Sequence, residues 1–256
     1  MIYQSERMTL CGVMDVFRGK VNDVVICEEV KGGRTSYYTL VLVKNHDTVR
    51  RLIRILERSE KSTPCMVDSF SWNNCFCLVF DYVKARPLSE FFMGAERSLE
   101  ECESICINLL LQCMTSPLPW PLLKLAIRQQ IHLLKDGDVR LGYELDLKDL
   151  DENCTEKQCV MECAMVIRDL LKEKLTKKNV SYQLLMKKIP RQGYQNFRDL
   201  YRDIRLSSSM VGKRSLKARI LGLYREHQAT IYKALLVVSV FLLILTVSMM
   251  ISQRIW

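Results

Sequence analysis

CLVFDYVKARPLSEFF, residues 77–92 of this 256-residue chain, marks the point at which the character of the sequence changes. Its first part is apolar and aromatic, as in a buried strand, and Pro87 then begins a stretch typical of a short helix. Strand-like patterns dominate before this stretch and helical patterns dominate after it. We therefore expect an α+β fold with a β-rich half, residues 1–95, and a helical half, residues 96–206.

The β-rich half combines several strand patterns with one helix. Its strand candidates are rich in β-branched and aromatic residues, and two of them are joined by a Gly-Gly turn. In chain order we expect strands over residues 21–30 and 35–43, a helix over residues 47–58, and a hairpin of residues 66–70 with 75–83. Helical spacing predicts that the buried face of the helix carries Val49, Leu52, Ile53 and Leu56.

The helical half opens with a capping box. Ser98 and Glu101 have the spacing that satisfies two free N–H groups at a helix start, and they predict a helix that runs to residue 115. Three prolines then end this helix and stiffen the next segment. An Asp-Gly turn predicts a small hairpin of residues 130–134 and 139–143. Further helices are expected over residues 155–175, 182–189 and 194–204.

ALLVVSVFLLILTVSMMI, residues 234–251, is a run of 18 residues without a charge. A helix of that length rises roughly 27 Å, which is close to the hydrocarbon thickness of a bilayer. We therefore expect a single transmembrane helix here. A basic juxtamembrane helix over residues 207–233 is expected before it, and a short tail over residues 252–256 after it.

Basic residues gather on one side of this span. Residues 185–233 hold nine more basic than acidic residues, which equals the net charge of +9 of the whole chain. Basic flanks stay in the cytoplasm, and no signal-peptide pattern opens the sequence. We therefore expect a single-pass cell-membrane protein with a cytoplasmic N-terminal domain. One interpretation is that these cations only set this topology. The other is that they also bind anionic lipid headgroups, with a stabilisation of about 1 kcal/mol for each cation. We do not expect a nucleic-acid partner. The residues expected at the membrane are Lys213, Arg214, Lys217, Arg219, Arg225, Tyr232, Lys233 and Trp256.

The 11 cysteines lack the regular spacing of a disulfide scaffold, which agrees with a reducing compartment. Cys102 with Cys106, and Cys159 with Cys163, are four residues apart and would each share a helix face. Metal binding is one interpretation of such pairs. No C-x-x-C or His-rich pattern supports it, so we expect burial as small apolar side chains and no metal site.

The order of these elements resembles the protein kinase fold, in which strands, one helix and a strand pair lead through a hinge to a helical half with a small hairpin. The resemblance covers residues 10–205 and implies a two-lobed kinase-like domain with a reduced helical lobe. The stretches that carry it are TLVLVKN (39–45), DTVRRLIRILERSE (47–60), residues 77–92, residues 98–115 and QIHLLKDGDVRLGYELD (130–146).

The resemblance also implies which chemical groups to look for, and two of them are missing. Kinases seat a nucleotide with a glycine-rich loop and a lysine, hold Mg²⁺ with acidic and amide side chains, and take up a proton with an aspartate. Gly12, Gly19 and Gly32-Gly33 do not form a G-x-G-x-x-G pattern. If Gln130 takes the place of the magnesium-binding asparagine, the place of the catalytic aspartate falls on Leu125.

The second magnesium motif is also replaced. The resemblance places Tyr143, Glu144 and Leu145 at its three positions, and Asp146 comes three residues late. Lys44 is then the one cofactor-binding candidate left, as a vestigial nucleotide lysine with Glu57 as its possible helix partner. The alternative is that Lys44 is a surface lysine at a strand end. We expect no catalytic residue, no metal ligand and no cofactor.

Other catalytic patterns are absent from the sequence. It has no G-x-S-x-G, no H-E-x-x-H and no phosphate-binding P-loop. Of its three histidines, His132 falls in a predicted strand, where a structural role is more common than catalysis. His46 precedes a predicted helix, and His227 lies next to the predicted span.

Three hypotheses of function follow. The first is an inactive kinase-like scaffold (a pseudokinase), anchored in the membrane, that binds a protein partner at the cytosolic face in a secretion or signalling complex. It is similar in plan to the membrane pseudokinase subunit of type VII secretion systems of Gram-positive bacteria, although only five residues follow the span here. The second is a divergent membrane-anchored serine/threonine kinase that uses Lys44 with Glu144 and Asp146. The third is a structural tail anchor that self-associates through its basic helix.

Overall fold

The structure is a computed structural model, and it describes residues 1–208 except residues 32, 59–64, 89–97, 135–136 and 173–178. The chain divides into two units, Met1–Ser209 and Met210–Trp256. Residues 209–256 therefore lie outside the described residues. They include the predicted span and its tail, the basic segment from residue 209 onward, and all eight residues expected at the membrane. Within the described part of the chain, no helix combines the length and apolar character needed to cross a bilayer.

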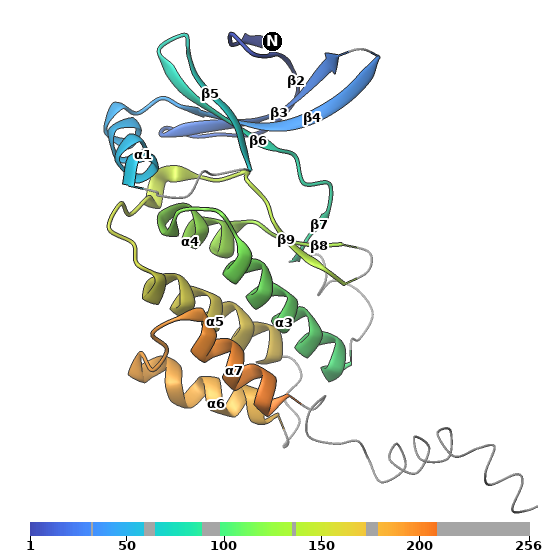
Figure 1. Cartoon of the computed structure of the whole chain (residues 1–256), viewed down its shortest axis with the longest axis vertical. Helices are drawn as coiled ribbons and strands as arrows, with labels where there is room; N and C mark the ends of the chain where they lie inside the picture. Colours follow the sequence, from blue (N-terminus) through green and yellow to red (C-terminus); the bar gives the residue numbers. More distant parts are fainter. Residues whose placement is uncertain (32, 59–64, 89–97, 135–136, 173–178, 209–256) are drawn as a thin grey trace, which may run out of the picture. The chain divides into compact units, whose positions relative to one another are not determined.

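A curled, six-stranded antiparallel sheet forms the β-rich half (Figure 1). Its strand order is β1-β2-β3-β4-β6-β5, so that the hairpin β5–β6 joins the sheet beside β4. The strands predicted over residues 21–30 and 35–43 and the predicted hairpin are confirmed, whereas β1 and β2 are additional. The bounds are β1 Ile2–Gln4, β2 Thr9–Arg18, β3 Asn22–Lys31, β4 Arg34–Val43, β5 Met66–Trp72 and β6 Cys75–Asp81.

Both faces of the central strands are buried. Along β4, Val41 and Val43 belong to one apolar cluster, while Leu40 and Leu42 belong to another on the opposite face. This alternation follows from the period of two in a strand. The second face is covered by β1, where the ring of Tyr3 meets Trp72 edge-on at 4.8 Å.

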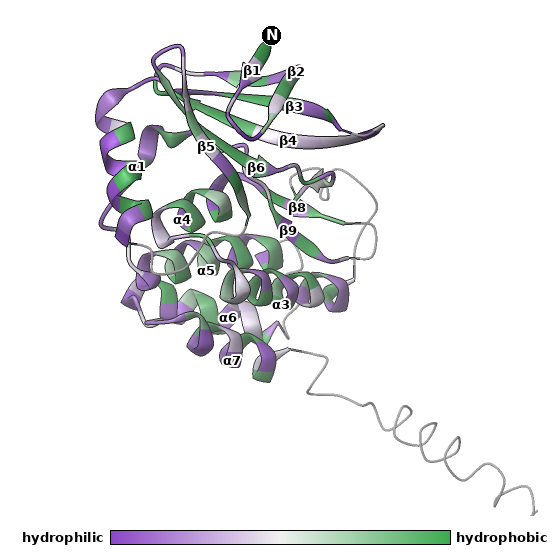
Figure 2. Cartoon of the chain, turned by 45° about the horizontal axis from the view of Figure 1, so that its top comes forward, coloured by the Kyte–Doolittle hydropathy of each residue, from purple (hydrophilic) through white to green (hydrophobic). Residues whose placement is uncertain are grey.

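One helix, α1 (His46–Arg58), packs against the first face of the sheet. Asn45 begins it by accepting a hydrogen bond from the backbone N–H of Thr48 at 2.9 Å. Leu52 and Ile55 are buried, and Val49 and Leu56 pack partly against the core. The prediction was wrong for Ile53, which is 40% exposed. Figure 2 shows both hydrophilic (purple) and hydrophobic (green) residues along α1.

The helical half contains α3 (Leu99–Thr115), α4 (Trp120–Gln129), α5 (Glu156–Lys172), α6 (Val180–Lys188) and α7 (Phe197–Ser207). The predicted capping box is confirmed, since Ser98 accepts from the N–H of Glu101 and the Glu101 carboxylate accepts from the N–H of Ser98. The helix α4 was not predicted. Pro121 lies in its first turn, where a missing N–H has no cost, so the proline starts this helix instead of preventing it.

A second, three-stranded sheet lies beside these helices in the order β7-β8-β9, with β7 Arg86–Pro87, β8 Ile131–Leu133 and β9 Val139–Leu141. The hairpin β8–β9 confirms the prediction from Asp-Gly. Its Gly137 has φ +87°, a conformation that glycine adopts without strain. Pro87 lies in β7 and not in the helix expected from residue 87, and residues 89–92 of that prediction fall outside the described part.

One continuous apolar core connects the sheet with the helices. The cluster that contains Val43 and Phe80 of the sheet and Leu52 of α1 also contains Leu109 of α3 and Ile127 of α4. Burying such side chains away from water is the main stabilising contribution of a fold of this size. The described residues therefore form a mixed α/β unit in which the helices hold the segment after β9 against the sheet.

Candidate functional site

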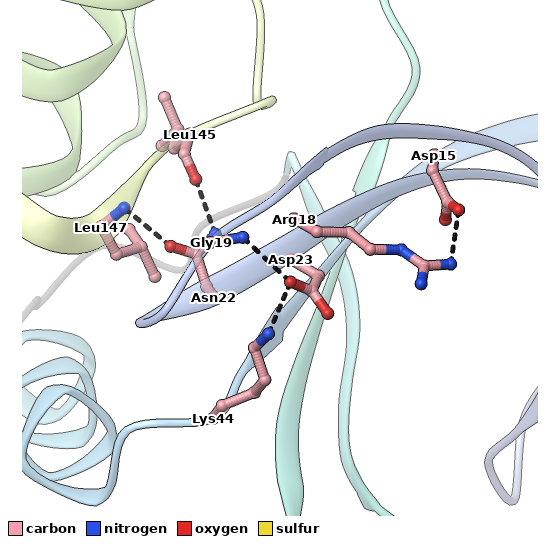
Figure 3. A network of polar contacts seen from close by, with 8 residues as sticks. All are labelled: Asp15, Arg18, Gly19, Asn22, Asp23, Lys44, Leu145 and Leu147. Carbon is pink, nitrogen blue, oxygen red and sulfur yellow. Dashed lines mark hydrogen bonds and ion pairs between the residues drawn. The ribbon is translucent and has the colours of Figure 1, made fainter.

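The candidate site is the place where the turn between β2 and β3 meets the segment that follows β9 (Figure 3). We call residues 19–23 the junction turn. The N–H of Gly19 donates to the carbonyl oxygen of Asn22 at 3.0 Å and to the carboxylate of Asp23 at 3.1 Å. A Cβ on residue 19 would lie 2.8 Å from the Asn22 carbonyl oxygen, so this close turn requires glycine.

Asn22 fixes the junction turn to the helical half. Its side chain is fully buried, its Nδ2 donates to the carbonyl oxygen of Leu145 at 2.9 Å, and its Oδ1 accepts from the N–H of Leu147 at 2.9 Å. One amide thus satisfies a donor and an acceptor that lie more than 120 residues away in the sequence. An amide is the side chain that suits this site, because it offers both groups without a charge.

Lys44 lies on the other side of the junction turn. Its ammonium group pairs with the Asp23 carboxylate at 2.7 Å, and the same carboxylate oxygen accepts the N–H of Gly19. The suggested pairing with Glu57 was wrong, since the side chain of Glu57 is exposed and Lys44 is paired within the sheet. At 38% exposed, the lysine contributes about 1 kcal/mol or less through this pair.

The segment aligned with the second magnesium motif is used for packing. The ring of Tyr143 stacks on Phe80 with centroids 5.0 Å apart, and burial raises the pKa of its phenol. Leu145 is part of the core. Asp146 begins a short 3-10 helix, Leu147–Asp149, by accepting from the N–H of Lys148 at 3.0 Å. Two of these side chains thus pack in the interior, and the third caps a helix.

Glu144 is the one acidic side chain of this segment that is buried. Its Oε2 lies 3.7 Å from Nε2 of His132, and both side chains are more than 90% buried. Among the described residues, neither ring nitrogen of His132 has a hydrogen-bond partner, and the same is true of Oε2 of Glu144. Gly142 lies against both, and a Cβ there would overlap with both groups. Sequence reasoning placed His132 in a structural role and missed this contact, because no local pattern links the two residues.

The positions of the missing base and of the magnesium-binding asparagine are also structural. Leu125 is buried in α4, within the core. The side-chain amide of Gln130 donates to the backbone carbonyl oxygen of Glu144 at 2.9 Å, and the backbone carbonyl of Gln130 accepts from the N–H of Gly142 at 2.7 Å. Gln130 therefore joins the hairpin to the segment after it, and its amide nitrogen is engaged.

The cysteines raised as possible metal ligands are buried. Cys102, Cys106, Cys159 and Cys163 lie in the core of the helical half. In the part of the chain that the structure covers, no three His, Cys, Asp or Glu side chains converge as a metal site would require. A surface groove of about 510 Å³ exists elsewhere, over α4 and the start of α5.

The candidate site is thus a junction between two segments of the chain. The Asn22 amide bridges them, Lys44 pairs with Asp23, Asp146 caps a helix and Glu144 is buried. Such an arrangement can hold two halves of a protein together and offers no open set of ligands for a metal-bound phosphate. No protein-family model matches this chain, and no curated protein matches it in sequence.

Proposed function

We propose that this chain is a catalytically inactive kinase-like scaffold, anchored in the membrane by residues 234–251, that acts by binding a protein partner at the cytosolic face. The observation that carries the proposal is the pair of hydrogen bonds in which the Asn22 side chain donates to the carbonyl oxygen of Leu145 and accepts from the N–H of Leu147. In a kinase, a flexible glycine-rich loop covers the phosphates and the magnesium motif lies beneath them. Here the corresponding turn and segment are bonded directly to each other.

The order of elements supports the kinase-like part of this proposal. The strand β4 ends just before Lys44, α1 follows at once, and β5–β6 then return beside β4. After the connection at β7 come α3 and the β8–β9 hairpin, which leads into residues 143–145. This is the order on which the sequence resemblance rests.

The side chains support the absence of phosphoryl transfer. That reaction needs cations held against the phosphate charge and a base for the accepting hydroxyl. Asp146 caps a helix, Glu144 faces His132 in the interior, and position 125 is a buried leucine. Without these groups the remaining use of the domain is a surface that binds another protein.

Nucleotide binding provides the direct test. Full-length protein in mild detergent should show no change in melting temperature when millimolar ATP and Mg²⁺ are added, because no ligand binds the native state. A rise in melting temperature that requires Mg²⁺ would contradict the proposal and support the divergent kinase. ATP without Mg²⁺ is the matched control for binding of a polyanion to basic residues.

The scaffold function has its own test. Pull-downs from detergent-solubilised membranes should recover the same partners, in equal yield, with wild type and with Lys44→Ala. Loss of the partners from Lys44→Ala alone would mean that their capture depends on the nucleotide lysine, and it would overturn the scaffold assignment.

A further inference from the structure

Two cysteines meet at the start of α5. Cys154 lies two residues before the helix and Cys159 lies in its first turns, with their sulfurs 3.7 Å apart. Between them, the side-chain oxygen of Gln158 accepts from the N–H of Thr155 at 2.9 Å, and the carbonyl of Thr155 accepts from the N–H of Cys159. The cysteines thus occupy the positions where apolar residues commonly meet across a helix start.

The two thiols differ in acidity. The neighbouring Cys159 thiol and the nearby charge of Lys124 lower the pKa of Cys154, whereas the neighbouring Cys154 sulfur and burial raise the pKa of Cys159. Positions at helix N-termini and beside lysine favour thiolates in general. Cys159 also lies 3.1 Å from the carbonyl oxygen of Trp120, to which it donates. The lowered pKa makes Cys154 the candidate nucleophile of the pair and Cys159 the candidate resolving thiol.

Cys154 is also the sulfur nearer to solvent. The groove of about 510 Å³ is lined by Lys124, Asn153 and Thr155, so that the residues on either side of Cys154 face it. Cys154 is 7% exposed and Cys159 is fully buried. Of the two cysteines, Cys154 is thus the one that retains some exposed surface, next to residues that line the groove.

We propose that Cys154 and Cys159 form an oxidisable dithiol that closes to a disulfide with peroxides. The Cys154 thiolate attacks one oxygen of hydrogen peroxide, the O–O bond breaks, and Cys154 becomes a sulfenic acid while hydroxide leaves and takes up a proton. The Cys159 sulfur then attacks Sγ of Cys154, the S–O bond breaks, and water leaves with the thiol proton. Two thiols are oxidised and one peroxide is reduced to two waters. The sulfurs must approach from 3.7 Å to about 2.0 Å, a change that side-chain rotation provides.

A second cysteine pair in the same half serves as an internal control. The interaction with Cys113 of α3, together with burial, raises the pKa of Cys163 of α5 well above its usual value. Both side chains are at most 1% exposed. Of the two pairs, only Cys154 and Cys159 include a thiol of lowered pKa and lie beside residues that line a groove.

The experiment is peroxide treatment of the folded full-length protein in mild detergent, followed by alkylation, trypsin digestion and mass spectrometry. The expected product links peptide 149–157, which contains Cys154, to peptide 158–168, which contains Cys159 and Cys163. Fragmentation of the linked peptides assigns the second sulfur. The control pair would instead link peptide 98–124 to 158–168. Absence of the first link, or equal yields of the two, would overturn the proposal.

Two variants test the assigned roles. In Cys159→Ser, the sulfenic acid has no resolving thiol, so dimedone should label Cys154 at least tenfold more than in wild type. In Cys154→Ser, dimedone labelling of peptide 158–168 should stay at background. Labelling of Cys159 in that variant would show that the nucleophile was assigned to the wrong sulfur. Circular dichroism before treatment confirms that both variants are folded.

Discussion

Two buried polar groups near the junction differ in how well they are satisfied. Asn22 uses both ends of its amide, each 2.9 Å from a backbone partner. His132 and Glu144 face each other at 3.7 Å, with three polar atoms lacking partners among the described residues. A satisfied buried amide stabilises one arrangement, whereas an unsatisfied pair costs free energy and tolerates replacement. Asn22 thus adds a fully satisfied polar link to the apolar core that joins the sheet to the helices.

The largest effect is expected from Gly142→Ala. The new methyl group would overlap with Nε2 of His132 and Oε2 of Glu144, and these two side chains, each more than 90% buried, would have to shift. We expect a loss of about 3 kcal/mol in the free energy of unfolding, measured by urea denaturation. Gly12→Ala is the control, because its Cβ would meet neighbours at 3.4 Å and should cost much less. Equal losses in the two variants would contradict the crowding at Gly142.

Asn22→Ala should come next. It leaves the carbonyl of Leu145 and the N–H of Leu147 buried without partners, and we expect a loss of about 2 kcal/mol in the free energy of unfolding. Asn108→Ala serves as the comparison, since the Asn108 amide is only partly buried and donates to Gly137 at 3.2 Å. If Asn22→Ala costs no more than Asn108→Ala, the bridge does not hold the two halves together.

Replacement of the unsatisfied pair should have a smaller effect. Either single change, His132→Leu or Glu144→Leu, leaves its former partner buried and alone, whereas the double change removes both polar groups. We expect the double variant to be at least about 1 kcal/mol more stable than the less stable single variant, in a double-mutant cycle measured by thermal unfolding. Additive losses would show that the pair is satisfied in solution.

The smallest effect is expected from Lys44→Ala. Its pair with Asp23 is partly exposed, so the loss should be about 1 kcal/mol or less and should shrink as salt is added. Urea unfolding at low and high ionic strength measures both quantities. A loss above that of Asn22→Ala would mean that Lys44 has a larger structural role than its geometry indicates.

Local signals in the sequence predicted elements well. The Ser98 capping box, the Asp-Gly hairpin and the amphipathic pattern of α1 are each specified within a few residues, and each is present. β2 was missed because its register shifts at Val13 and Val16 remove the alternation of buried and exposed residues. α4 was missed because its prolines suggested an interruption, although a proline in the first turn is compatible with a helix.

The candidate site was less predictable than the elements. Lys44 was singled out, but its partner Asp23 lies on a neighbouring strand and was not considered. Asn22 carried no signal, because its partners are backbone groups of residues 145 and 147, and any residue type offers those groups. Contacts between segments so far apart depend on how the halves dock, which local sequence does not encode.

The burial of Leu125 has an evolutionary consequence. An aspartate at this position would have to give up its hydration inside the core, at a cost of several kcal/mol, a large share of the stability of an ordinary domain. A lineage descended from such a chain would need to rebuild the packing of α4 before an acid became tolerable there. A single substitution to an acid at position 125 is therefore opposed by the packing of α4.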